Sequence, residues 1–254
     1  ATTAEVALYG IAMTVFNAYM SISTVITSVF LPRVTAMTNQ ENRDSELSAL
    51  FIRIGRIQYL LLSCVLSGFV LFGRQFVDIW SGKSQAYLIT LCLIVPFTID
   101  LIQNIGITIL QAEKKMAFRS ISFLIGAAVN IGVSALAAIY FGVVGCALAT
   151  GLMFFLMNVV LNIYYAKKIH LQIGSFWREI GKMTLPCLLA MIPGVGIMLL
   201  PLGSGIVSLG VRVLMYLVVF VPVMWLFALN DYEKDLAKMG KDHENTKGYP
   251  IYIN

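Results

Sequence analysis

Two charged residues lie inside hydrophobic stretches of the sequence, and they are its best candidates for chemistry. The first, Asp100, lies near the middle of a stretch from residue 86 to residue 111. A carboxylate at the centre of a membrane helix costs about 2.5–3.5 kcal/mol, so we expect it to face protein or water rather than lipid. Asn104 follows four residues later, which places both side chains on one helix face. Two interpretations are open: a cavity group that binds a cation, a proton or substrate hydroxyls, or a structural carboxylate paired with Arg212 or a neighbouring amide.

Arg212 is the second such residue, and it lies about two turns into the last hydrophobic stretch. A long basic side chain near the end of a membrane helix extends its charge to the interface, whereas one that points inward offers a binding charge for an anion. The interfacial interpretation is favoured. The inward interpretation, an anion-binding charge, also remains open.

A stripe of small and polar residues runs along the first hydrophobic stretch, residues 6–31, which contains no charge in 26 residues. Its members recur at steps of three or four, which places them on one helix face: Gly10, Thr14, Asn17, Ser21, Thr24 and Ser28. Lipid offers such groups no hydrogen-bond partner, so the stripe must face water or another helix. It is therefore either the wall of a polar cavity or a contact between closely packed helices.

The composition places these stretches in a membrane. Of the 254 residues, 59% are hydrophobic and 12% are charged, against about 25% charged in an average soluble domain. We predict an all-α polytopic membrane protein with seven transmembrane helices. Residues 120–166 carry no charge and are too long for one crossing, so we expect two helices joined by a turn near residues 140–145. Pro32 is expected to end the first helix.

The predicted chain has four parts, and its charges orient them. Five spans occupy residues 1–166, a cytoplasmic interfacial segment residues 167–182, two further spans residues 183–229, and a cytoplasmic tail residues 230–254. With the amino terminus outside, the inner side holds 15 of the 18 Lys and Arg residues. The positive-inside rule therefore predicts an outer amino terminus and a cytoplasmic carboxy terminus.

Nothing in the sequence indicates an enzyme. The only histidines, His170 and His243, lie among solvated charges, and the four cysteines fall in apolar runs without metal-ligand spacing. We therefore predict no catalytic residues, no metal and no cofactor. The positive charge follows the membrane topology, so no nucleic-acid partner is expected.

Several short segments, in this order, resemble the carboxy-terminal part of polysaccharide repeat-unit flippases. This is the O-antigen and capsule branch of the multidrug, oligosaccharidyl-lipid and polysaccharide exporter superfamily. The resemblance covers most of the chain up to about Lys182, and its segments are 7–9, 31–34, 110–120, 126–130, 141–150, 162–168 and 176–177. The chain differs from the related lipid II flippases, in which a cavity arginine follows the first of these segments. Met13 and Thr14 occupy that neighbourhood here.

The resemblance implies helices 8–14 of a fourteen-helix transporter built from two lobes around a central cavity. The chain would then be a fragment, or one part of a split protein, whose amino-terminal lobe is missing. The substrate implied is a polyprenyl-pyrophosphate-linked oligosaccharide, moved from the inner to the outer leaflet of the bacterial cytoplasmic membrane by alternating access. Implied partners are that lobe, membrane lipids and the polysaccharide polymerase machinery. The expected cavity residues are Thr14, Asn17, Ser21, Thr24, Asp100, Asn104 and Arg212.

Two other functions remain open from the sequence. A cation-coupled multidrug exporter of the same superfamily would use an intramembrane acid such as Asp100. A stand-alone seven-helix receptor or scaffold would also have an outer amino terminus. A retinal protein is disfavoured because the last span contains no lysine.

Overall fold

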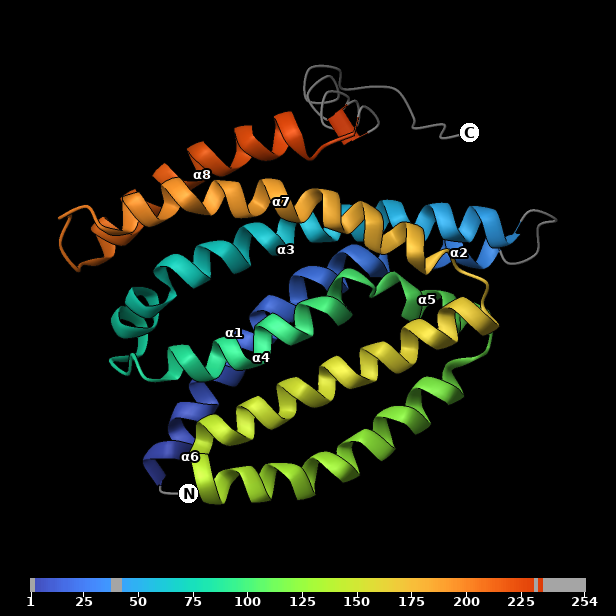
Figure 1. The fold of residues 1–254 in the computed structure, drawn as a ribbon, viewed down its shortest axis with the longest axis horizontal. Helices are drawn as coiled ribbons and strands as arrows, with labels where there is room; N and C mark the ends of the chain where they lie inside the picture. Colours follow the sequence, from blue (N-terminus) through green and yellow to red (C-terminus); the bar gives the residue numbers. More distant parts are fainter. Residues whose placement is uncertain (1–2, 38–42, 231–232, 235–254) are drawn as a thin grey trace.

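The computed structural model describes residues 3–37, 43–230 and 233–234, and within them the chain is helical, without a β-strand. Most of the predicted tail, residues 230–254, lies outside the described residues. The helices, shown in Figure 1, are α1 (Thr3–Ser28), α2 (Leu31–Met37), α3 (Arg43–Ser81), α4 (Ala86–Ile102), α5 (Ile105–Ala112), α6 (Met116–Lys168), α7 (Ile173–Met198) and α8 (Ile206–Phe227).

Five of these helices are long and apolar enough to cross a membrane: α1, α3, α6, α7 and α8. The pair α4 and α5 forms a sixth candidate, because the two are apolar together but bent by 47° at a short break. The predicted all-α class is thereby confirmed, and several helices have the length and apolar composition that a membrane protein needs. This class follows from the long uncharged stretches, since a helix satisfies every backbone hydrogen bond within its own segment.

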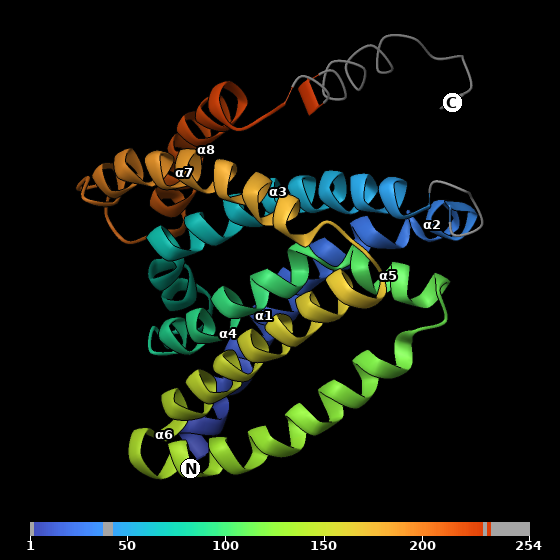
Figure 2. The ribbon, with the colours of Figure 1, turned by 45° about the vertical axis from the view of Figure 1, so that its right-hand side comes forward.

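The long helix α6 contains the predicted reversal. Gly142 has non-helical dihedral angles (φ 59°, ψ −145°), a conformation that glycine adopts without the steric cost other residues meet. Figures 1 and 2 show the chain doubling back there into two antiparallel arms. The predicted turn at residues 140–145 is confirmed at this glycine.

Several helix boundaries differ from those predicted. The stretch expected as one helix from residue 86 to residue 111 breaks at Gln103 and Asn104, whereas Pro96 lies inside α4 without interrupting it. Pro32 was expected to open a loop but lies in the first turn of α2. Backbone N–H groups of a first turn have no acceptor within the helix, so the missing N–H of proline costs no hydrogen bond there. The predicted interfacial segment up to Lys182 continues without a break into α7.

Two hydrophobic clusters hold the helices together, and α3 contributes to both. The larger joins α1, α3, the α4–α5 pair, the second arm of α6 and the start of α7. The smaller joins α7 and α8 to the middle of α3. Figure 1 shows α7 and α8 lying along one side of α3, opposite the two arms of α6. The final helix pair is therefore attached to the rest of the described chain mainly through α3.

Candidate functional site

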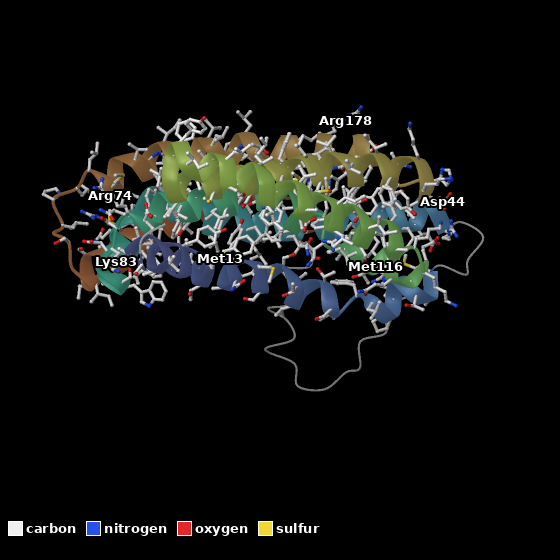
Figure 3. All side chains as sticks on the ribbon, turned by 90° about the horizontal axis from the view of Figure 1, so that it is seen from below. Met13, Asp44, Arg74, Lys83, Met116 and Arg178 are labelled. Carbon is white, nitrogen blue, oxygen red and sulfur yellow. The ribbon has the colours of Figure 1, made fainter. Side chains whose placement is uncertain are left out.

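The polar stripe of α1 lies on the outside of the described structure. All six stripe residues, from Gly10 to Ser28, are exposed, whereas the opposite face of α1 buries Phe16, Tyr19 and Ser23 against α3 and α4. Figure 3 shows α1 along one outer edge of the molecule, with Met13 on its length. The polar face of this helix is thus available to water or to another protein segment.

The stripe makes no hydrogen bond to another helix within the described residues. The hydroxyls of Thr14, Ser21, Thr24 and Ser28 each donate to a backbone carbonyl of α1 itself, at 2.7–3.0 Å. The Asn17 amide has no hydrogen-bond partner in this part of the chain. Hydrogen bonds between helices of the described chain therefore do not account for the stripe, and both a polar cavity and a contact with another protein segment stay open.

Beside the stripe, an apolar groove of about 460 Å³ runs between α1, α3 and α8. It begins on the residues of α1 that alternate with the stripe, Val15, Ala18 and Ile22. Its other walls include Val65 of α3 and Val213 of α8. A polar surface and an apolar surface thus lie next to each other on one side of the molecule. Such a pair of surfaces suits an amphiphilic ligand, which has a polar and an apolar part.

Asp100 is buried, with 7% of its surface exposed, and its partner is Arg119. The Arg119 Nη2 atom lies 3.4 Å from Oδ2 of Asp100, and its guanidinium also covers the ring of Phe123. The suggested pairing of Asp100 with Arg212 is therefore wrong. Asp100 lies in the last turn of α4 and Arg119 in the first turn of α6, so the ion pair joins the C-terminal end of α4 to the N-terminal end of α6.

Asn104 belongs to a buried polar network at the break between α4 and α5. Its Nδ2 donates to the Ser23 hydroxyl at 3.1 Å, and that hydroxyl donates to the Leu101 carbonyl at 2.8 Å. The Gln58 amide lies 3.1 Å from the Ser23 hydroxyl and 2.8 Å from that of Thr27. Rotating this amide by 180° also brings its nitrogen to 3.1 Å from the carbonyls at the end of α4.

This network explains how a broken helix is tolerated inside the fold. A break frees backbone carbonyls, and side chains of α1 and α3 supply donors at that point. Ser23, Thr27 and Gln58 were not predicted as functional residues. The available signal was the four-residue spacing of Ser23 and Thr27 on the side of α1 away from the stripe, together with an amide inside an otherwise apolar span.

Arg212 lies at the other end of the molecule, at the connection between α7 and α8. Its guanidinium donates to Oε1 of Gln75 and to the carbonyl of Leu200. It takes no part in the stripe or in the network around Asp100. The predicted set of seven cavity residues therefore falls into three places: the exposed stripe, the buried break, and the α7–α8 end.

Arg56 is a buried arginine with two ion-pair partners. From the sequence alone, it was counted only as one of the inner positive charges. With 3% of its side chain exposed, it pairs with Glu179 at 2.8 Å and with Glu233 at 2.6 Å. It also donates to the carbonyl of Ala228 at the end of α8, at 2.8 Å. One side chain thus ties α3 to α7 and to the segment after α8.

No group of three or more His, Cys, Asp or Glu side chains within the described ranges is placed to hold a metal ion. In comparisons with known proteins, no protein-family model, no curated protein and no solved structure matches the chain.

Proposed function

We propose that the chain is the carboxy-terminal part of a polysaccharide repeat-unit flippase, in which the polar stripe of α1 lines the substrate path. The observation that carries the proposal is the exposure of Thr14, Asn17, Ser21 and Thr24 on a helix whose other face is packed. Facing hydrocarbon, the Asn17 amide would have no partner, and the hydroxyls would keep only their bonds to backbone carbonyls of α1. A second lobe facing α1 across a water-filled cavity removes that penalty.

The span count proposed is seven. Counting the two arms of α6 separately and the bent pair α4–α5 as one broken span gives seven crossings, with α1, α3, α7 and α8. An odd number puts the ends of the chain on opposite sides. The charge bias then places the start of α1 outside and the end of α8 in the cytoplasm of a bacterial cell.

The substrate proposed is a polyprenyl-pyrophosphate-linked oligosaccharide. Sugar hydroxyls match the side chains of the stripe, while the apolar groove beside it offers a surface for hydrocarbon. Rocking of the two lobes about the bound molecule would move the sugars between leaflets without making or breaking a bond.

The alternative of a cation-coupled exporter has less support. Such a transporter needs a carboxylate free to exchange a cation, whereas Asp100 is paired with Arg119. A stand-alone receptor or scaffold would leave the stripe facing lipid, where the Asn17 amide has no partner, whereas a water-filled path supplies one.

The test replaces the stripe's polar groups in cells whose surface polysaccharide depends on the whole gene. The variant Asn17→Leu/Thr24→Val is expected to reduce exported polysaccharide at least tenfold, because it removes donors and acceptors for sugar hydroxyls without touching the packed face of α1. The matched control, Val218→Leu on the exposed side of α8, is expected to export normally. Normal export by the stripe variant, at equal protein level, would contradict the proposal.

A further inference from the structure

A pocket of about 340 Å³ with charged and apolar side chains in its lining lies at the end of the molecule where α3 leads into α4 and α7 into α8. Figure 3 shows this end, with Arg74 and Lys83, opposite the end that carries Asp44 and Met116. The polar residues that line the pocket come from two parts of the chain that are far apart in the sequence, residues 74–84 and 204–212: Arg74, Gln75, Asp78, Ser84, Ser204 and Arg212.

Arg212 is held in a fixed position on the wall of this pocket. Gln75 accepts one of its N–H groups, and the Leu200 carbonyl accepts another at 2.9 Å. Gln75 is itself fixed by a 2.9 Å bond to the hydroxyl of Ser208, which is buried. The Nε–H of Arg212 is buried and has no partner in the described part of the chain. The guanidinium is therefore preorganised, with a donor still unused.

Three further side chains of the pocket lining have donors without a partner among the described residues. The side chains of Arg74, Ser84 and Ser204 make no hydrogen bond or ion pair with any described residue. The charged residues of the lining are one aspartate, Asp78, and two arginines, so the pocket has a net charge of +1. Guanidinium groups with neighbouring hydroxyls form charge-assisted hydrogen bonds to the oxygens of a phosphate.

The surface around the pocket is apolar. Leu199 and Val207 are each 77% exposed and Ile206 is 70% exposed, and all three flank the α7–α8 turn that forms one wall. Trp80, a residue type enriched at membrane interfaces, is half exposed on the α3 side. Exposed aliphatic side chains surround a charged pocket, so hydrocarbon chains attached to a bound phosphate would contact apolar surface. This arrangement fits a lipid phosphate better than a free inorganic phosphate.

We propose that this pocket binds the phosphate of an anionic lipid in the leaflet at the α7–α8 end, with Arg212 and Arg74 as the phosphate ligands. The proposal requires only that this end lies at a membrane interface, and it does not depend on the transported substrate.

The test measures lipid retained by the purified chain after exchange into micelles with equal amounts of phosphatidylglycerol and phosphatidylcholine, quantified by mass spectrometry. Retention of phosphatidylglycerol is expected to exceed that of phosphatidylcholine, whose ammonium group cancels the phosphate charge. Arg74→Gln and Arg212→Gln are each expected to lower it about tenfold, the effect of losing one charged hydrogen bond. Asp78→Asn is expected to raise it, because it removes the opposing charge.

The matched control is Lys83→Gln, which removes a positive charge at the same end but outside the pocket lining. Retention in this variant is expected to equal that of the unmodified chain. Equal losses in Arg74→Gln and Lys83→Gln would show a diffuse surface charge and overturn the proposal. Displacement of the lipid by millimolar inorganic phosphate would overturn the lipid assignment in favour of a free phosphate. Arg74 is exposed and unbonded, so its variant remains informative even if Arg212→Gln fails to fold.

Discussion

Replacing Arg56 with leucine is expected to lower the free energy of unfolding by about 3–5 kcal/mol, the cost of breaking a buried ion pair from one side. Glu179 and Glu233 would lose their shared cation, and the Ala228 carbonyl would lose a donor. Because these groups belong to three segments, we expect α7 and α8 to loosen from α3 before the rest of the chain unfolds. A drop in Tm on the order of 10 °C in detergent would report the loss.

The control for this prediction is Arg178→Leu. Arg178 lies next to Glu179 on α7 but is exposed and points away from the fold, as Figure 3 shows. Its replacement removes the same charge and is expected to change stability by no more than about 0.5 kcal/mol. If Arg56→Leu and Arg178→Leu both have the same Tm as the unmodified chain, Arg56 does not hold α7 and α8 against α3.

Replacing Arg119 with leucine is expected to be similarly costly, again about 3–5 kcal/mol. The change leaves Asp100 buried with no opposing charge, at the point where α4 breaks. The double variant Asp100→Asn/Arg119→Leu is expected to recover most of the loss, because a neutral amide avoids burying an uncompensated charge. Thermal unfolding of the two single variants and the double variant forms a double-mutant cycle.

Additive effects in that cycle would contradict the pairing of Asp100 with Arg119. The same variants address ion coupling. If Asp100 carries a coupling proton or cation, Asp100→Asn changes the pH dependence of export. Unchanged export and pH dependence would leave Asp100 with a structural role.

The sequence predicted what depends on local pattern. The spacing from Thr14 to Thr24 identified one face of α1, and the structure places that face outward. A 47-residue stretch without charge implied two helices, and Gly142 is where the chain turns. Both predictions follow from helix geometry and from the length needed to cross a membrane.

The sequence did not predict pairings between distant residues. Arg119 was not predicted as the partner of Asp100, because their separation along the chain says nothing of their contact in space. Arg56 was counted toward topology, and its partners lie 123 and 177 residues away. The break after Ile102 was missed because Pro96 is the local signal for a break, whereas the actual one is stabilised by side chains of α1 and α3.

The central claim, that the stripe of α1 faces a water-filled path, is tested most directly by thiol labelling. Asn17→Cys and Val218→Cys, each made in the whole gene, are treated with a charged maleimide in open membrane fragments. The whole protein without either substitution gives the background, because the described residues include four free cysteines. A thiol must ionise to react, which water permits and hydrocarbon does not. We expect Asn17→Cys to react at least tenfold faster than Val218→Cys, whose position on α8 is 72% exposed and apolar. Equally slow labelling of both would place the stripe against lipid or protein and contradict the claim.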